Sequence, residues 1–230
     1  MNDRRGDGEG RRDTPGATST TVFVRGLPSY FWLKGLIDRY FALLALIAAA
    51  PLMIYLILRV RSDSPGPALF TQTRAGLRAA PFTLYKFRTM RTDVDPYGDS
   101  PQSGRDPRLT DFGVWLRESS LDELPQLLNV VRGEMSLIGP RPLYIQQIPE
   151  WSERHKSRLL VKPGLTGLAQ INGRGALTIE EKLEWDTRYV EEASLALDAA
   201  IIWTTIRQVV TRSGIYEVQY STTQTRRTGR

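Results

Sequence analysis

Residues 40–58 read YFALLALIAAAPLMIYLIL, nineteen residues without a charge and with a single proline at Pro51. About twenty apolar residues are the length with which an α-helix enters the hydrocarbon core of a bilayer. Pro51 removes one backbone donor and clashes with the preceding turn, so we expect a kink at Ala50-Pro51. The stretch therefore predicts a membrane anchor.

Cationic residues flank this stretch on both sides. Lys34 and Arg39 precede it, and Arg59 and Arg61 follow it. A spanning helix usually carries its Lys/Arg excess on the cytoplasmic side alone. The flanks therefore give no orientation, and both ends are able to face the cytosol. A re-entrant helical hairpin and a straight span with a tolerated proline fit these residues equally well.

The rest of the chain divides into a leader, one soluble domain and a tail. Residues 1–28 contain few apolar side chains and are predicted to be disordered. Residues 29–61 form the anchor. The breaker cluster that begins at Ser62 opens a cytosolic domain over residues 62–214, which is long enough to bury a core of its own. Residues 215–230 are predicted to be a loose basic tail.

Short elements are expected within the soluble domain, which we predict to be α+β and mostly helical. Residues 68–73 and 82–89 resemble the strands of a β-hairpin. Residues 93–108 are polar and rich in turn formers, which predicts a surface loop able to close over a ligand. Apolar spacing predicts helices over residues 124–132, 144–160 and 195–210.

The last predicted helix has an apolar side that allows two interpretations. The side is formed by Leu195, Ile202, Trp203, Ile206 and Val210. Such a face most often packs into a core. Alternatively, the helix lies on a membrane surface with its tryptophan at head-group level.

Composition restricts the classes of function. The formal charge of +6 favours anionic partners, among them nucleic acid, phosphorylated substrates and acidic lipid. The aromatic residues do not interleave with the cations as in base-stacking surfaces, which argues against nucleic acid. The absence of cysteine excludes disulfides, thiolate zinc sites and a cysteine nucleophile.

Ser120-Leu121-Asp122-Glu123-Leu124-Pro125-Gln126 places two adjacent carboxylates near a predicted helix start. Ser120 and Glu123 match a capping box, which would give Glu123 a structural role. A helix that starts at Asp122 or Glu123 instead puts Pro125 in the tolerant first turn. Both carboxylates would then lie at the positive helix end, ionised and ready to bind a metal or attack an electrophile. Neighbouring helical side chains point about 100° apart, which suits separate tasks and argues against a glycosidase pair.

Nineteen residues after Asp122, Arg141 stands between Pro140 and Pro142. The two prolines stiffen the segment, and a guanidinium held in this way suits bidentate phosphate binding. Glycines near Lys162 and Arg174 would offer backbone donors to a diphosphate. His155, the only histidine, lies among cations and is not favoured as a general base. Further cations stand beside turns or on a strand, where most such side chains are simply solvated: Arg74, Lys86, Arg88, Arg105 and Arg108.

The order and spacing of five motifs closely resemble the bacterial sugar transferase family, the monotopic phosphoglycosyl transferases. The similarity runs from about Lys34 to Gly214. The motifs are Lys86–Met90, Asp106–Thr110, Ser120–Gln126, Gly133–Pro142 and Lys162–Arg174. The resemblance implies a re-entrant membrane helix broken at Pro51, although Ala50 stands where a serine also occurs in the family. It further implies a minimal catalytic form without the multi-span amino-terminal extension of larger relatives.

The resemblance also implies an activity and its site. A sugar 1-phosphate passes from a UDP-sugar to polyprenol (undecaprenyl) phosphate, with release of UMP, at the cytosolic face of the bacterial inner membrane, and this opens exopolysaccharide or glycoconjugate synthesis. Asp122 is the expected nucleophile, Mg²⁺ is held by Asp122 and Glu123, and Arg141 holds phosphate. A homodimer is compatible with these expectations. The residues expected to bind substrate are Lys86, Arg88, Arg108, Lys162, Gly164, Thr166, Arg174 and Asp186.

The expected mechanism is a covalent relay in which Asp122 carries the phosphosugar before the acceptor takes it. Direct transfer between the two substrates is the chemical alternative. A membrane-surface scaffold that only binds anionic lipid is the alternative without catalysis.

Overall fold

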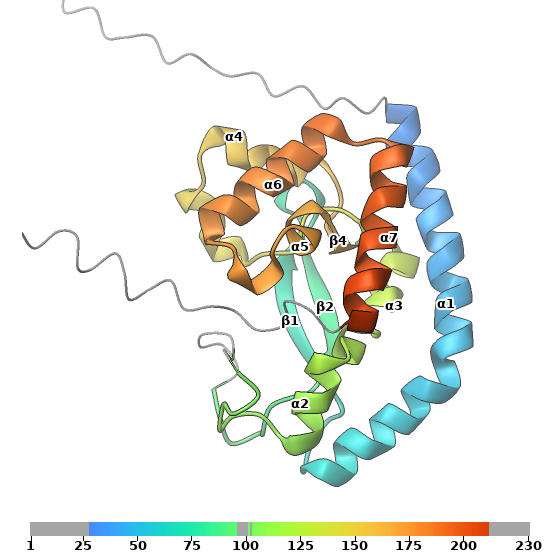
Figure 1. Cartoon of the computed structure of the whole chain (residues 1–230), viewed down its shortest axis with the longest axis vertical. Helices are drawn as coiled ribbons and strands as arrows, with labels where there is room; N and C mark the ends of the chain where they lie inside the picture. The colour runs from blue at the N-terminus through green and yellow to red at the C-terminus, as the bar shows by residue number, and fades with distance from the viewer. Residues whose placement is uncertain (1–27, 96–100, 102, 212–230) are drawn as a thin grey trace, which may run out of the picture.

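The computed structural model describes residues 28–95, 101 and 103–211. The predicted lead, the basic tail and the middle of the loop at 93–108 lie outside these residues. The described elements surround a central hairpin, with a long helix along one side of the domain (Figure 1).

That long helix, α1 (Pro28–Asp63), contains the uncharged stretch and continues through Pro51. Figure 1 shows it changing direction in its carboxyl-terminal part, where it turns toward α2 (Asp111–Glu118). Only 11 % of its most apolar stretch of 18 residues is buried. By length and composition, α1 is able to cross a membrane. A helix that is apolar on all sides and remains exposed suits lipid rather than water. The re-entrant break at Pro51 stays a prediction, because the helix is continuous there.

The predicted hairpin is confirmed with small shifts in its ends. Strand β1 (Leu69–Ala75) pairs antiparallel with β2 (Pro81–Phe87), so that Leu69 lies opposite Phe87. The short 3₁₀ turn η1 (Leu77–Ala79) connects them.

The predicted helix at 124–132 is present as α3 (Gln126–Arg132), preceded by the 3₁₀ turn η2 (Leu121–Glu123). It ends at Gly133, whose φ of 79° is in the left-handed region that glycine adopts without strain. A side chain there would also collide with Arg39 of α1, since a Cβ would lie 2.0 Å from a guanidinium nitrogen. Gly133 thus ends the helix and lets α1 approach it.

Two short strands that the sequence did not predict follow α3. Strand β3 (Ser136–Ile138) pairs parallel with β4 (Gly164–Thr166). A Cβ on Gly164 would lie 2.1 Å from the backbone nitrogen of Gly139. Gly164 therefore serves the close approach of two backbones, and its expected role in binding a substrate diphosphate is not what its packing supports.

The predicted helix over 144–160 is wrong. The segment instead forms the 3₁₀ turn η3 (Ile145–Glu150), the short helix α4 (Glu153–Lys156) and the 3₁₀ turn η4 (Ser157–Leu160). Pro149 cannot donate a helical hydrogen bond, and Trp151 is extended. Ser152 then caps a new helix by accepting from the His155 backbone N–H.

The carboxyl-terminal part is helical. It comprises α5 (Leu168–Ile171), η5 (Arg174–Ala176), α6 (Ile179–Glu192) and α7 (Leu195–Thr211). The prediction of a helix at 195–210 is confirmed, but the core interpretation of its apolar side is wrong. Trp203 is 73 % exposed and Val210 78 %, whereas the opposite side buries Asp198 and Ile201. Figure 1 shows α7 running alongside α1.

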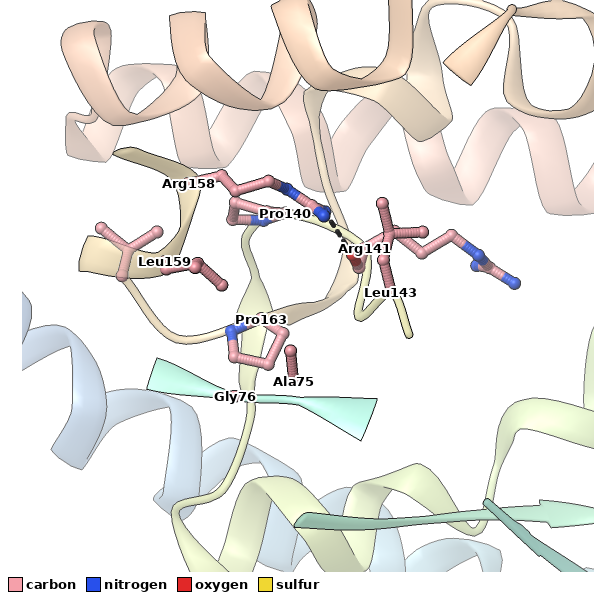
Figure 2. Close-up of a pocket in the computed structure, with 9 residues that line it drawn as sticks. Ala75, Gly76, Pro140, Arg141, Leu143, Arg158, Leu159 and Pro163 are labelled. Atoms are coloured by element: carbon pink, nitrogen blue, oxygen red, sulfur yellow. Dashed lines mark hydrogen bonds between the residues drawn. The ribbon is translucent and has the colours of Figure 1, made fainter. Parts of the chain in front are cut away.

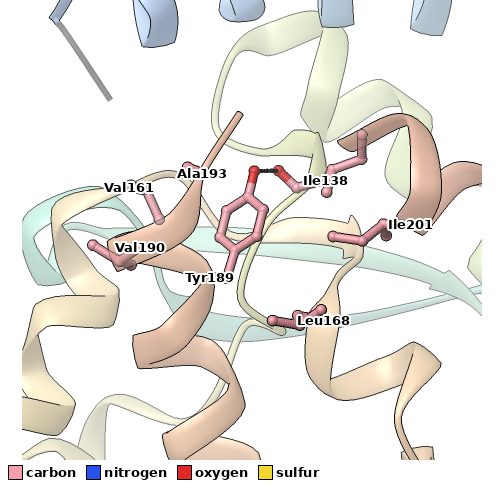
Figure 3. Close-up of a cluster of buried hydrophobic side chains, with 7 residues drawn as sticks. All are labelled: Ile138, Val161, Leu168, Tyr189, Val190, Ala193 and Ile201. Atoms are coloured by element: carbon pink, nitrogen blue, oxygen red, sulfur yellow. Dashed lines mark hydrogen bonds between the residues drawn. The ribbon is translucent and has the colours of Figure 1, made fainter. Parts of the chain in front are cut away.

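One of the three core clusters joins α6 and α7 to the β3–β4 pair. Figure 3 shows Tyr189 at its centre, donating its hydroxyl to the Ile138 carbonyl at 3.2 Å. A buried polar network adjoins it, in which the Lys34 ammonium pairs with Asp38 at 3.1 Å and with Asp198 at 3.0 Å. Asp38 also accepts from the Leu137 backbone N–H at 3.3 Å. Helix α1 is therefore fixed to the strand that leads to Arg141.

Candidate active site

Three segments of the fold meet at Glu123. Lys86 Nζ, from β2, lies 2.9 Å from Glu123 Oε1. Arg141 Nη2, from the segment after β3, lies 2.9 Å from the same oxygen. The fold thus brings Arg141 to the Asp-Glu pair, and Lys86 joins them.

The turn that carries Asp122 and Glu123 is positioned by α3. Asn129 of α3 is fully buried and donates to the Thr83 carbonyl of β2 at 2.7 Å, while its side-chain oxygen accepts from the Tyr85 N–H at 3.2 Å. These two hydrogen bonds hold α3 against the hairpin. They therefore set the distance from Glu123 to Lys86.

Ser120 does not cap this turn. Its φ of 57° places it in the left-handed region, which is strained for serine, and its side chain makes no capping hydrogen bond. The capping-box role for Glu123 is therefore set aside. The expectation that α3 starts at Asp122 or Glu123 is wrong by a few residues, because these two occupy η2 and α3 begins after Pro125.

The two neighbouring carboxylates have opposite electrostatic environments. Asp122 is 8 % exposed. Burial raises its pKa to about 6, and Glu123 adds to this shift, while Lys86 and other cations oppose it. Burial also acts on Glu123, but Arg141 and Lys86 outweigh it and hold the pKa of that carboxyl well below its usual range. The predicted division of tasks fits this contrast. The expected stabilisation of both ionised carboxylates by the helix end does not fit, because burial has the largest effect on the pKa of Asp122 and raises it.

The backbone around Arg141 is held from both sides. The Gly164 N–H donates to the Pro140 carbonyl at 2.8 Å. Figure 2 shows the Arg158 guanidinium donating to the Arg141 carbonyl, while the Arg141 side chain extends away from the hollow beneath. Arg158 in turn pairs with Asp186 at 2.7 Å. The stiff segment that the prolines predict is thus reinforced by hydrogen bonds.

Asp186 is placed differently from its prediction as a substrate-binding residue. It is 1 % exposed, and burial raises its pKa to about 6 although Arg158 opposes this. The Arg141 backbone also donates to it. Its carboxylate lies inside the domain and supports the segment that presents Arg141.

Arg88 also serves the fold rather than an exposed site. The side chain is buried, and it donates to the carbonyls of Pro65 at 2.7 Å and Ser64 at 2.6 Å, just after the end of α1. Its prediction as a substrate-binding residue is therefore not supported. It fastens the end of α1 to the hairpin.

Three other predicted residues have described partners elsewhere in the fold. Arg108 pairs with Asp106 at 2.7 Å. The Lys162 ammonium lies 3.9 Å from the position of a Cβ on Gly35 of α1; burial lowers its pKa, as does the nearby Arg39. The Thr166 hydroxyl lies 2.7 Å from that of Thr205 in α7. Arg174 begins η5, and its side chain is outside what the structure describes.

Sequence reasoning missed two arginines that act at this site. Arg117 of α2 donates to the Thr89 hydroxyl at 3.0 Å, and its charge acts on Asp122. Arg158 lies over the Trp151 ring, 4.9 Å from the ring centre, and holds Arg141 as described. Neither stands in a distinctive motif. Only their proximity in the fold reveals them.

A divalent cation fits this site through two carboxylates only. In the described residues no group of three or more His, Cys, Asp or Glu side chains comes together. Mg²⁺, however, commonly takes one or two carboxylates and completes its shell with water and substrate phosphates. Lys86 and Arg141 both donate to Oε1 of Glu123, so Oε2 and the Asp122 carboxylate provide a suitable donor set.

The hollow beneath Arg141 is small. Its cavity volume is about 10 Å³, far below the roughly 300–1,000 Å³ of pockets that enclose small ligands. Figure 2 shows its lining residues, among them Ala75, Pro140 and Pro163.

Comparisons with known proteins agree with this arrangement. A family model described as bacterial sugar transferase matches residues 29–212. The chain is 43 % identical over 192 residues to the uncharacterized sugar transferase EpsL of Bacillus subtilis, covering 84 % of this chain and 94 % of that one. It is 41 % identical over 195 residues to a UDP-glucose:undecaprenyl-phosphate glucose-1-phosphate transferase of Caulobacter vibrioides, covering 80 % and 72 %.

A third relative shows the same region inside a longer protein. The chain is 42 % identical over 189 residues to the undecaprenyl-phosphate glucose phosphotransferase of Komagataeibacter xylinus. The match covers 77 % of this chain but only 36 % of that protein.

Proposed function

The chain belongs to the bacterial sugar transferase family and is a transferase, and from this we propose that it moves a sugar 1-phosphate from a UDP-sugar to polyprenol phosphate and releases UMP. The names of two relatives contain undecaprenyl phosphate and glucose, which supports this choice of substrates. The observation that carries the proposal is a buried carboxylate, Asp122, beside a carboxylate held by two cations.

In the first step, a carboxylate oxygen of Asp122 attacks the phosphorus that bears the sugar. A new oxygen–phosphorus bond forms, and the bond from that phosphorus to the bridging oxygen breaks. The bridging oxygen leaves with its electron pair on UMP. Arg141 is the group that stabilises charge developing on the phosphoryl oxygens, because it reaches the site from a fixed segment.

In the second step, a phosphate oxygen of the acceptor attacks the phosphorus of the aspartyl phosphosugar. The bond to Asp122 breaks, and the carboxylate returns to its starting state. A phosphate monoester has a second pKa near 6, so much of the acceptor is already doubly ionised at pH 7. No general base is required, which agrees with His155 lying on α4 beside Glu184.

Mg²⁺ is the cofactor that we propose, held by Asp122 and Glu123 together with substrate phosphates. When bound, it would supply charge neutralisation on the diphosphate of the donor. Lys86 and Arg141 keep Glu123 ionised, and an ionised carboxylate is the form that binds a cation.

We further propose that α1 enters the inner membrane from the cytosolic side and returns to it. Support comes from its exposed apolar surface and from the cations at both ends of the uncharged stretch. The exposed apolar side of α7 would rest at the lipid surface. The site would then lie at head-group depth, within reach of a soluble donor and a lipid-borne acceptor.

UMP release tests the proposed function. The full chain in lipid nanodiscs containing polyprenol phosphate is incubated with Mg²⁺ and each of a panel of UDP-sugars. We expect UMP from one or a few of these sugars, and loss of UMP release when EDTA removes the metal. Absence of UMP with every donor would favour a scaffold that only binds anionic lipid.

The pH dependence of kcat/KM for the donor should show an acidic limb. Asp122 must be ionised to attack, and its pKa is raised to about 6 by burial. Activity should therefore fall on the acidic side, approaching tenfold per pH unit, and a Mg²⁺ held by Asp122 would move this fall to lower pH because the cation favours the ionised carboxylate. Because Asp122 and Glu123 interact, the measured value belongs to the pair.

Lys86→Met provides the matched comparison for this profile. The Lys86 charge lowers the pKa of Asp122, so its removal should move the acidic limb to higher pH. The donor alone, without acceptor, should be used in a single turnover, which keeps the titration of the acceptor phosphate out of the measurement. A limb that stays in place in Lys86→Met would contradict the assignment to Asp122.

A further inference from the structure

Arg74, near the end of β1, is a partly buried cation whose contacts are all with neutral groups. Its Nε donates to Gln72 Oε1 at 3.0 Å, and its Nη2 donates to the same oxygen. Its guanidinium carbon lies 3.6 Å from the centre of the Tyr144 ring. In the described part of the chain, no acidic side chain pairs with it or shifts its pKa.

The two neighbours of Arg74 hold each other. Gln72 is buried and donates its side-chain N–H to the Tyr144 hydroxyl at 2.8 Å. The guanidinium is therefore fixed along one edge by an amide oxygen and across one face by an aromatic ring. A fork held in this way loses little freedom when it binds a planar or tetrahedral oxyanion.

Arg74 lies close to the segment that presents Arg141. The Ala75 N–H donates to the Leu143 carbonyl at 3.0 Å, which joins the end of β1 to the residues after Arg141. Ala75 and Arg141 line the same hollow (Figure 2). Tyr144, which supports Arg74, is three residues beyond Arg141. The two arginines thus belong to adjoining backbones.

The electrostatics of Arg74 are unfavourable without an anion. Burial lowers its pKa to about 10; Tyr144 opposes this, and the positive charge of Arg141 lowers it further. Arg74 is still charged at neutral pH. A desolvated cation beside a second cation is stabilised when an anion binds between or beside them.

We propose that Arg74 is a second phosphate-binding residue, which acts with Arg141 on a phosphate or diphosphate group of a substrate. Within the described part of the chain, the hydrogen bonds of Arg74 use Nε and Nη2. The N–H groups of Nη1 can therefore donate to a ligand. The identity of that ligand rests on the proposed function. The phosphate belongs either to the donor diphosphate or to the acceptor, and kinetics can tell these two sources apart.

Binding of inorganic pyrophosphate tests the site without any turnover. We expect Arg74→Met to bind pyrophosphate about 10- to 100-fold more weakly than the natural chain, because a hydrogen bond between charged groups is lost. Arg74→Lys, which keeps the charge and loses the fork, should fall between the two. The full chain in nanodiscs and isothermal titration calorimetry would be used.

Arg132→Met is the matched control. Arg132 also lies over a tyrosine, 5.2 Å from the centre of the Tyr85 ring, but its charge does not shift Arg74, Asp122 or Glu123. This variant should bind pyrophosphate like the natural chain. Equal affinity in Arg74→Met and Arg132→Met would overturn the proposal.

Steady-state kinetics then assign the phosphate. A rise of about 10- to 100-fold in KM for the UDP-sugar alone identifies the donor diphosphate, and a similar rise for polyprenol phosphate alone identifies the acceptor. Unchanged KM and kcat in Arg74→Met would overturn a substrate role. If the natural chain releases no UMP, the proposed function fails, and the pyrophosphate titration still decides whether Arg74 binds anions.

Discussion

Asp122→Asn should abolish turnover while making the protein more stable. The substitution removes the attacking oxygen's charge and keeps the shape of the side chain. Loss of a covalent nucleophile costs roughly 10⁴- to 10⁶-fold in kcat. UMP release by this variant, with polyprenol phosphate and a reactive UDP-sugar present, should therefore lie at or near background.

The raised pKa of Asp122 also predicts the direction in which Asp122→Asn changes the stability of the protein. Burial raises the pKa of Asp122 from 3.8 to about 6, so the folded state disfavours the ionised form. Stability that the protonated form provides is fully present below pH 3.8 and is lost as pH rises through 6. Asparagine is neutral at every pH, so Asp122→Asn should gain up to about 3 kcal/mol above pH 6 and nothing below pH 3.8.

Thermal unfolding at pH 7.5 and pH 4 measures this difference and separates lost chemistry from lost folding. A variant that is inactive and has a raised Tm at pH 7.5 supports a buried nucleophile. An inactive variant with a lowered Tm at both pH values would point to a structural role for Asp122 instead.

Arg141→Ala should have the second largest effect on activity. Arg141 contacts Glu123 and reaches the place where phosphoryl charge develops, so its removal should lower kcat about 10²- to 10³-fold. Arg141→Lys should recover part of this loss, because lysine keeps the charge without the planar fork. The effect on kcat should exceed the effect on KM, since the charge is greatest in the transition state.

Arg188→Ala is the control for Arg141→Ala. Arg188 pairs with a glutamate at the same distance, 2.9 Å from Glu192, and its side chain is 51 % exposed compared with 45 % for Arg141. It lies on α6, and its loss should leave kcat unchanged. Equal activity of the two variants would remove Arg141 from the reaction.

Patterns among neighbouring residues are enough to predict several helices and strands and part of the candidate site. The hairpin, α3 and α7 follow from residue spacing, and the grouping of Asp122, Glu123 and Arg141 follows from motif order. The helix predicted over 144–160 is wrong because Pro149 interrupts the segment whose apolar spacing suggests it. A proline and an extended tryptophan divide that segment.

The roles of several residues could not be predicted, because they depend on contacts with residues far away in the sequence. The sequence predicts that Gly164 offers a backbone donor to a diphosphate, yet Gly164 packs in a parallel strand pair whose partner lies 28 residues earlier, at Ser136. Arg88 and Asp186 are predicted to bind substrate. Their burial, which only the fold shows, gives them structural partners.

Intact mass spectrometry after incubation with a reactive UDP-sugar and Mg²⁺, without acceptor, tests the covalent relay most directly. The account predicts a mass increase equal to one sugar phosphate, located on the peptide that contains Asp122 and absent from Asp122→Asn, with UMP formed in equal amount. An unmodified protein that forms UMP only after polyprenol phosphate is added would contradict it and establish direct transfer.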